Sequence, residues 1–168
     1  MTVHAGMTIE FLSVFRTIPN TEPSLPAPEI EARIVRELQA AGLKATAPRR
    51  AIVRELMGDT SHPTAQQLYD RLRGRLSTLS FATVYNTLRA LDAVGHLGRL
   101  ELGGATRFDP NVTPHHHAVC GRCGGVQDVP MRRTPRKPEL AGFAVERVEY
   151  VYRGVCSACR DGGEADAT

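Results

Sequence analysis

The stretch of sequence that decides the fold is residues 80–109, SFATVYNTLRALDAVGHLGRLELGGATRFD. Its first half begins at Ser80, a residue type that caps helices, and ends at Gly95. Apolar residues recur in it at helical spacing: Val84, Leu88, Leu91 and Val94. The apolar period then shortens and the pair Gly103-Gly104 supplies a turn, which is typical of a β-hairpin. We therefore expect one helix followed directly by two short antiparallel strands.

Three helical patterns precede this stretch, at about residues 29–42, 46–58 and 64–76. In the last of these, Thr64 and Gln67 have the spacing of a capping box. Three short helices followed by a β-hairpin make a winged helix, and the helix just before the hairpin is expected to read the major groove of DNA. The predicted fold class is therefore α+β, with an N-terminal winged helix-turn-helix domain that ends at Asp109.

A second domain, which contains strands, is predicted over residues 110–160. The segments 126–129 and 143–152 are rich in Val and Tyr, which is typical of strands, and the connection between them is irregular, basic and interrupted by prolines. The winged helix itself is expected to begin at residue 29. Residues 1–28 are predicted to be a flexible extension because their prolines forbid a long helix, and residues 161–168 are predicted to be a disordered tail.

Positive charge is concentrated in the winged-helix half. Residues 30–100 carry eleven Lys and Arg against six Asp and Glu, whereas residues 101–168 carry nine of each kind. This asymmetry favours nucleic acid as a partner, although a solvated basic surface explains it equally well. No segment approaches the roughly 18 apolar residues of a membrane-spanning helix, and no secretory signal pattern is found. We therefore expect a cytoplasmic protein with no membrane partner.

Four cysteines form two pairs with metal-ligand spacing, Cys120-x-x-Cys123 and Cys156-x-x-Cys159. Zn²⁺ takes four thiolates in a tetrahedron, and two intervening residues let both sulfurs of a pair face one ion. Two disulfides or four free thiols are the alternatives, but the expected compartment favours a metal. We predict a closed structural zinc site that pins strands of the second domain together and leaves no position for catalysis.

A second set of potential ligands consists of His115, His116 and His117, with Asp109 before them and Asp128 after them. On an extended chain, His115 and His117 project to one side, and His116 projects to the other side, where we expect it to face solvent. Two imidazoles with a carboxylate suit Mn, Fe, Co, Ni or Zn better than Mg or Ca. The alternative is a polar loop with solvated histidines, and the adjacent zinc pattern favours ligands.

Other residues bear on different functions. His4 and His96 are expected on the surface, and so is His62 when it is considered alone. A metallohydrolase needs an open metal position with a general base nearby, and only Glu101 is close in sequence. No His-Glu-x-x-His motif is present. We therefore expect that the chain is not an enzyme, and the remaining alternative is a zinc-ribbon interaction module that does not respond to a second metal.

Several segments occur in the order found in the ferric uptake regulator family, which the chain resembles over about residues 30–160. They are GLKATAPR at 42–49, HPTA at 62–65, SFATVYNTLR at 80–89, RFD at 107–109 and HHHAVCGRC at 115–123, followed by the second cysteine pair. The resemblance implies a winged helix, a C-terminal α/β dimerisation domain and a regulatory metal bound between the two. It also implies a repressor that binds a palindromic operator in double-stranded DNA as a homodimer.

The resemblance implies that one regulatory ion is bound by five side chains: His62, Asp109, His115, His117 and Asp128. Iron-sensing members usually have Glu at the position of Asp109, whereas the peroxide-sensing branch has Asp. The chain is therefore most similar to the peroxide-responsive regulators, with Fe²⁺ or Mn²⁺ as the regulatory ion and Zn²⁺ as another candidate. The alternative is a manganese, iron or zinc uptake regulator that does not sense peroxide.

The resemblance also implies a set of DNA-binding residues: Lys44, Arg49, Ser80, Thr83, Tyr85 and Asn86. Tyr85 and Asn86 would meet base edges or the thymine methyl group. Lys44 would reach the minor groove, and Arg49 would hold a phosphate, which supplies affinity rather than sequence selectivity. Core packing beside Val84 is the alternative for Tyr85.

The chain departs from the family in two places. The family usually carries an amphipathic helix where residues 129–141 are short, basic and broken by prolines. We therefore expect a dimer contact that is reduced or built differently. A further sensory site of some members needs acidic and His ligands late in the chain, where this sequence has Glu146, Arg147 and Val148. We expect that this site does not exist here.

Overall fold

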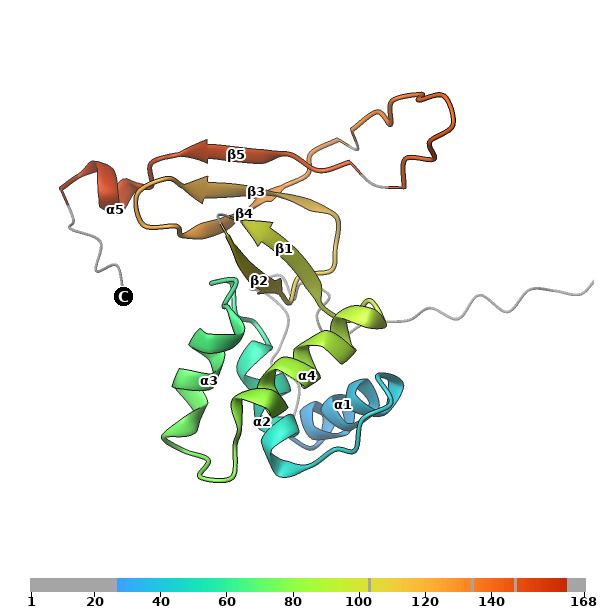
Figure 1. The fold of residues 1–168 in the computed structure, drawn as a ribbon, viewed down its shortest axis with the longest axis vertical. Coiled ribbons are helices and arrows are strands. Elements are labelled where there is room, and N and C mark those ends of the chain that lie inside the picture. The colour runs from blue at the N-terminus through green and yellow to red at the C-terminus, as the bar shows by residue number, and fades with distance from the viewer. Residues whose placement is uncertain (1–26, 103, 134, 147, 163–168) are drawn as a thin grey trace, which may run out of the picture.

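The computed structural model describes residues 27–102, 104–133, 135–146 and 148–162. The elements, in chain order, are α1 (Ala27–Ala40), α2 (Ala47–Leu56), α3 (Ala65–Arg73), α4 (Phe81–Ala93), β1 (Gly98–Leu102), β2 (Ala105–Asp109), β3 (His115–Cys120), β4 (Val126–Pro130), β5 (Val151–Gly154) and α5 (Ser157–Arg160). Figure 1 shows α1 to α4 gathered at one end of the molecule and the sheet of β3, β4 and β5 at the other. Among the described residues, no helix has the length and apolar character needed to cross a bilayer.

The predicted extension and tail lie almost entirely outside the described residues. The one difference is that α1 begins at Ala27, so the last two residues assigned to the extension are helical. The structure does not test the predicted domain limits themselves, which remain a prediction.

Helices α1 to α4 enclose the hydrophobic core of the first domain. The core consists of aliphatic side chains from all four helices and from the segments that flank α4, together with Phe108 of β2: Ile34, Leu38, Ile52, Val53, Leu56, Ala65, Leu68, Leu72, Leu79, Val84, Leu88, Leu91, Leu97 and Phe108. Full burial of a Val, Leu or Ile side chain contributes about 1.5–3 kcal/mol to folding. The apolar positions that predicted the helix after Ser80 are thus the inward face of α4, except that Val94 lies just beyond its end and is exposed.

The helix starts follow the capping residues of the sequence. Thr64 Oγ1 accepts from Gln67 N at 3.1 Å, and Gln67 Oε1 accepts from Thr64 N at 2.9 Å, which confirms the capping box before α3. Ser80 Oγ accepts from Thr83 N at 3.1 Å before α4. Thr46 precedes α2 as expected but makes no side-chain cap hydrogen bond.

The predicted hairpin is present and lies against the start of α3. β1 and β2 pair antiparallel from Gly98 opposite Asp109 to Leu102 opposite Ala105. Phe108 N donates to Pro63 O at 3.0 Å, and Thr64 bridges to Arg107 in the manner of a short strand pair. β2 therefore fixes the segment before α3, which brings residue 62 beside the end of the hairpin.

The second domain is a three-stranded sheet with β3 in the centre, in the order β4-β3-β5. β3 pairs antiparallel with β4, and His117 lies directly opposite Asp128. Side chains of directly paired residues share one face of the sheet at close range. β3 pairs parallel with β5, from His117 opposite Val151 to Cys120 opposite Gly154.

Part of the predicted strand pattern is wrong. The strand expected over residues 143–152 begins only at Val151 and ends at Gly154. A turn with Gly142 at a φ of +73° joins Leu140 to Phe143, and β3 offers parallel pairing only to the last residues of the segment. The described residues of 131–149 contain no helix, as the sequence indicated, whereas the short helix α5 after Cys156 was not predicted.

Candidate metal centres

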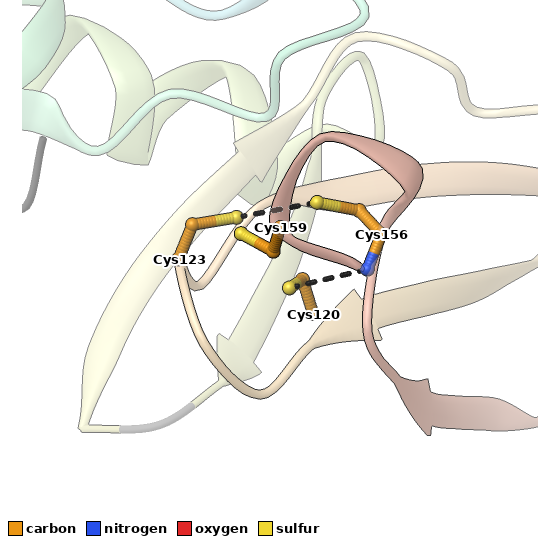
Figure 2. Close-up of side chains that lie close together, drawn as sticks. All are labelled: Cys120, Cys123, Cys156 and Cys159. Carbon is orange, nitrogen blue, oxygen red and sulfur yellow. Dashed lines mark hydrogen bonds between the residues drawn. The ribbon is translucent and has the colours of Figure 1, made fainter. Parts of the chain in front are cut away.

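The four cysteines converge on one point, as the spacing of the two pairs predicted. Cys120 ends β3 and Cys123 lies in the following turn, while Cys156 and Cys159 flank the start of α5 (Figure 2). The four sulfur atoms all lie within 4.8 Å of one another, and those of Cys123 and Cys156 are 3.8 Å apart. This separation is far longer than a disulfide bond of about 2 Å. The arrangement fits a thiolate metal site and not two disulfides.

The hydrogen bonds of this cluster favour thiolates. Backbone N–H groups of Cys123, Cys156 and Arg122 point at the sulfur of Cys120 and lower the pKa of that thiol to about 6. In contrast, hydrogen bonding to Cys156 and burial raise the pKa of Cys159 to about 12. Four thiolates at this distance repel one another unless a cation lies among them, so the donor set suits a tetrahedral ion such as Zn²⁺.

The cysteine cluster joins two segments of the second domain that are far apart in the sequence. Gly121 N donates to Gly154 O at 2.8 Å, and Arg122 Nη1 donates to Cys159 O at 2.7 Å. A metal held by all four sulfurs would therefore fasten the turn between β3 and β4 to the segment that follows β5.

The second cluster, here called the His–Asp centre, consists of His62, Asp109, His115, His117 and Asp128. Each side chain comes from a different place in the fold or from alternate positions of one strand. His62 precedes α3, Asp109 ends β2, His115 and His117 lie on β3, and Asp128 lies on β4. One donor atom from each lies within 4.8 Å of all the others. The structure thus brings together the five side chains that the resemblance implied as ligands.

The donor atoms of the His–Asp centre face one another at short range. His115 Nε2 lies 2.8 Å from His117 Nε2, and Asp109 Oδ2 is 3.1 Å from the first and 3.3 Å from the second. Asp128 Oδ1 lies 2.7 Å from His62 Nε2 and 3.4 Å from His115 Nε2. His62 Nε2 is 3.7 Å from Asp109 Oδ1. Three ring nitrogens and two carboxylates therefore converge on one small volume.

Burial makes this convergence costly without a cation. The side chain of His62 is 0% exposed, and within the described residues neither of its ring nitrogens makes a hydrogen bond of good geometry. Asp128 Oδ1 is in the same condition although it lies 2.7 Å from His62 Nε2. Buried polar atoms are normally satisfied, and leaving one unsatisfied costs about 1–3 kcal/mol. Atoms that point at a shared centre without hydrogen bonding are what a metal site requires.

The ionisation of the centre agrees with its geometry. Burial works to lower the pKa of His115, but hydrogen bonds to Asp109 and Asp128 outweigh it and raise that pKa to about 10. The same contacts outweigh burial at both carboxylates and hold their pKa values below the usual range. A proton on His115 offsets part of the charge of the two carboxylates, and a metal must displace that proton because ligands bind deprotonated.

His115 is also oriented for metal binding. Its Nδ1 lies 2.7 Å from Thr113 O, and because a carbonyl oxygen only accepts, Nδ1 is the donor. The lone pair of the neutral ring is then on Nε2, the atom that faces the other ligands. A backbone carbonyl on the second ring nitrogen is the usual way in which a ligand histidine is held.

The segment that carries His62 is held in an uncommon backbone conformation. His62 has a φ of +51°, the only positive value at a non-glycine among the described residues. Such a conformation persists where the surroundings determine it, as at binding sites. Arg107 Nη1 donates to His62 O at 3.1 Å, which fixes the peptide group after the ligand.

Asp59 organises the same segment from its other end. Its Oδ1 accepts from Ser61 N at 2.8 Å and its Oδ2 accepts from Arg71 Nη1 at 2.7 Å, while Arg71 Nη2 donates to Ser61 Oγ at 2.9 Å. Burial works to raise the pKa of Asp59, but these hydrogen bonds outweigh it and keep the pKa below its usual value. The network ties the loop before His62 to α3.

We expect Asp59→Ala to lower the free energy of unfolding by about 1–2 kcal/mol near neutral pH, since hydrogen bonds to a charged group are lost. Because the pKa of Asp59 is depressed in the folded chain, its contribution is present above the unfolded pKa, about 4, and disappears as the pH falls through the folded value. Urea denaturation at neutral and acidic pH measures this.

A matched control is Asp70→Ala, which removes an exposed pair with Arg73 on the surface of α3. Its expected cost is below about 0.5 kcal/mol, as for other surface ion pairs. Equal losses for the two variants, or a loss at Asp59 that does not change with pH, would contradict the role given to the Asp59 network.

Two expectations about the other histidines are wrong. His116 is buried, where its Nδ1 accepts from Tyr150 N at 3.2 Å and its ring packs against Tyr150 and Tyr152. It does point away from the His–Asp centre, as the alternation along β3 requires, but a second set of residues covers that side. His96 is buried against Glu37 of α1. His4 lies outside the described residues.

Glu101 does not serve the centre as a base. Its carboxylate accepts from Thr106 Oγ1 across the hairpin at 3.0 Å, and its side chain is exposed. Sequence reasoning overlooked Asn111 and Arg107, whose hydrogen bonds reach Asp128 and His62 respectively. The signal for Asn111 was an Asx-type turn, Asp-Pro-Asn, placed immediately after a ligand.

The DNA-binding role of the six residues named in the sequence remains a prediction. Tyr85 and Asn86 are exposed on α4, so core packing does not explain Tyr85. Phe81 stacks on Tyr85, and the guanidinium of Arg89 lies over the ring of Tyr85 at 5.9 Å. The remaining members make hydrogen bonds within the fold. Ser80 caps α4 by accepting from Thr83 N, the hydroxyls of Ser80 and Thr83 contact each other, and Arg49 Nη1 donates to Lys44 O.

Known proteins share this sequence pattern and this fold. The profile of the ferric uptake regulator family matches residues 40–147. The peroxide-responsive repressor PerR of Staphylococcus epidermidis is 34% identical over 140 residues, which cover 80% of this chain and 93% of that protein. The structure of the Vibrio cholerae ferric uptake regulator superposes with a TM-score of 0.55 at 26% identity, covering 73% of this chain and 98% of that one. A structure of the Pseudomonas aeruginosa regulator with manganese gives 0.54 at 26% identity, covering 74% and 98%.

Proposed function

The chain belongs to the ferric uptake regulator family, whose members are dimeric DNA-binding transcriptional regulators and not enzymes, and from this premise we propose how its own residues regulate DNA binding. It is a metal-dependent repressor in which Zn²⁺ at the four cysteines stabilises the second domain. Fe²⁺ or Mn²⁺ at the His–Asp centre couples the two domains. The manganese-containing structure of a relative supports this choice of ion, as does a donor set of imidazoles and carboxylates.

One observation carries the proposal: the ligands of the His–Asp centre come from both domains. His62 belongs to the DNA-binding domain, and Asp109 ends its hairpin. His115, His117 and Asp128 belong to the sheet of the second domain. Side chains on two bodies satisfy one ion only when the bodies hold one relative orientation. A conformer in which the domains turn apart loses His62 from the set and binds the ion less tightly.

Linkage then makes DNA binding respond to metal. An ion shifts a conformational equilibrium by the ratio of its affinities for the two states, and here that ratio favours the orientation in which all five ligands converge. In a dimer this orientation sets the separation of the two α4 helices, which must match two half-sites of a palindromic operator. Coupling free energies of this type amount to about 1–3 kcal/mol, or about 5–150-fold in operator affinity.

The proposed operator contacts follow from exposure and charge. Tyr85 and Asn86 on the outer face of α4 meet base edges and thymine methyl groups, whereas Arg49 and Lys44 contact the backbone and the minor groove. Ser80 and Thr83 place the start of α4 against a phosphate while Ser80 caps the helix. Such a protein acts in the cytoplasm, where the chromosome is.

We further propose that the regulator responds to peroxide. The relative that is 34% identical is a peroxide-responsive repressor, and Asp109 is the residue type that its branch carries. When bound, iron would supply the redox chemistry that activates peroxide, and the imidazole would supply the net two electrons. His62 or His115 then gains one oxygen atom and the second oxygen leaves as water, so that one H₂O₂ is consumed for each oxidised imidazole. An oxidised ring no longer fits the centre, and the operator is released.

The test is a titration of the full-length dimer on a palindromic duplex with Mn²⁺, Fe²⁺ or Zn²⁺, with and without peroxide. We expect peroxide to release the iron-loaded protein only, with one added oxygen located by mass spectrometry on His62 or His115. Asp109→Glu, which carries the residue of iron-sensing members, is expected to keep metal-dependent binding and resist oxidation. Release by peroxide with both histidines unmodified contradicts the proposal.

The alternative is an uptake regulator for manganese, iron or zinc, for which the same centre supplies the ligands. It predicts that metals activate operator binding at different concentrations and that peroxide changes nothing. The manganese-containing structure of a relative supports this alternative as much as it supports Mn²⁺ at the His–Asp centre. The titration with peroxide distinguishes the two.

A further inference from the structure

Asn111 joins the two carboxylates of the His–Asp centre. It lies in the turn between β2 and β3, two residues after Asp109. Its backbone N–H donates to Asp109 Oδ1 at 2.8 Å, and its side-chain Nδ2 donates to Asp128 Oδ2 at 2.7 Å. One residue thereby engages one oxygen of each carboxylate, although Asp109 and Asp128 belong to different domains.

The orientation of the Asn111 amide is fixed by a third hydrogen bond. Thr113 N donates to Asn111 Oδ1 at 3.1 Å. Because a backbone N–H can only donate, the oxygen of the amide must face Thr113 and the NH₂ group must face Asp128. The contact to Asp128 is therefore a hydrogen bond from Asn111 to a carboxylate, which is among the stronger kinds.

The two oxygens that Asn111 leaves are the ones that face the histidines. Asp109 Oδ2 lies 3.1 Å from His115 Nε2, and Asp128 Oδ1 lies 2.7 Å from His62 Nε2. Of the oxygens engaged by Asn111, Asp109 Oδ1 is 3.7 Å from His62 Nε2. Each carboxylate thus presents its other oxygen to the ring nitrogens at the shortest range.

We propose that Asn111 is a positioning residue, which holds both carboxylates to one-oxygen binding and so keeps a coordination position for a small oxygen ligand such as water or peroxide. Three imidazole nitrogens and two oxygens make five donors, whereas an octahedral ion takes six. Carboxylates bind metals with one oxygen or with two. Without the Asn111 amide, Asp128 is free to bind through both oxygens and fill the sixth position. The proposal rests on the proposed function in that a divalent ion of this kind occupies the centre.

The test uses the full-length zinc-containing dimer loaded with Mn²⁺, and measures the water-proton relaxation rate per bound ion. This rate reports water exchanging in the first coordination sphere of the ion. The wild-type protein is expected to show that contribution, and Asn111→Ala is expected to lose it. Mn²⁺ must be saturating because the loss of a residue behind the ligands typically weakens affinity about 10–100-fold.

Two further variants keep the result interpretable. Thr113→Ala alters the same turn but keeps the backbone groups that bond to Asn111 and His115, and it should retain the relaxation of the wild type. Asn111→Ser keeps a hydroxyl that can accept from Thr113 N but is too short to reach Asp128, so it should behave like Asn111→Ala even if the latter folds poorly.

The outcomes separate this inference from the function on which it rests. Equal relaxation per ion in the wild type and both Asn111 variants overturns the inference, and so does a wild type without first-sphere water. If the wild type binds Mn²⁺ at the cysteine site alone, or binds the operator without regard to Mn²⁺, the proposed function fails instead. A difference in relaxation between the wild type and the Asn111 variants supports the role of Asn111 even if the protein is insensitive to peroxide. In that case only the proposed peroxide response fails.

Discussion

A protein with Asn in place of His62 is expected to bind Mn²⁺ but to bind its operator no more tightly with Mn²⁺ than without it. Four of the five ligands remain, all of them on β2, β3 and β4. The lost ligand, His62, is the one that precedes α3. Without it, the affinity for the ion no longer depends on the orientation of the domains. The wild type should gain about 5–150-fold in operator affinity on metal binding, whereas the variant should gain almost nothing.

Asn is the appropriate replacement because His62 has a φ of +51°, a region that Asn tolerates better than Ala. The matched control is His116→Asn, on the same strand as two of the ligands but on the opposite face of the sheet. An Asn oxygen can accept from Tyr150 N as His116 Nδ1 does, and the control should keep its metal response. Calorimetry with Mn²⁺ and fluorescence anisotropy on labelled operator measure the two affinities. A metal response in the His62 variant equal to that of the wild type would refute the coupling.

Replacing Cys123 by Ala is expected to unfold the second domain while α1 to α4 remain folded. The sheet is small and the strand β5 is exposed along its length, so it lacks a large core of its own. Binding of structural Zn²⁺ contributes apparent free energies of about 10–16 kcal/mol in zinc-finger peptides. The first domain has its own buried core of helices and Phe108, which does not include the cysteines.

The expected results are a monomer in sedimentation analysis, loss of operator binding, and rapid proteolysis within residues 110–160 with helical circular dichroism largely retained. Removal of zinc from the wild type by a chelator should produce the same state. Ser157→Ala lies between two ligands without supplying one and should change none of these properties. A Cys123 variant that remains a protease-resistant dimer would show that zinc does not maintain this domain.

The parts of the fold that local sequence determines were predicted. Thr64 and Gln67 form a capping box wherever that spacing precedes a helix, and the Gly103-Gly104 pair leaves few choices other than a tight turn. The cysteine pairs are of the same kind, because two residues between cysteines suffice to direct both sulfurs to one ion. These features depend on neighbours within a few positions, so the remainder of the chain does not alter them.

Features that depend on distant partners were missed or wrong. His96 was expected on the surface because nothing near it in the sequence shows that Glu37 covers it. Likewise, Tyr150 covers His116 from more than 30 positions away. The strand expected from residue 143 has the composition of a strand, but its pairing with β3 begins only at Val151. Strand formation requires a partner, and composition alone does not supply one.

The His–Asp centre lies between these cases. The alternation of His115 and His117 predicted two ligands on one face, and the register of β3 and β4 then adds Asp128. His62 could be assigned only from the resemblance to the family, because its place beside them depends on the packing of β2 against the start of α3. The hydrogen bond from Asn111 to Asp109 has a local signal in the Asx-type turn, whereas the one to Asp128 joins residues 17 positions apart and has none.

The most direct measurement of the central claim is the position of the ion in crystals of the Mn²⁺-loaded dimer, located by anomalous scattering at the manganese edge. One ion in contact with His62 Nε2 and with the Nε2 atoms of His115 and His117 is the predicted result. An ion bound by β3 and β4 residues alone, with His62 turned away together with the DNA-binding domain, would contradict it.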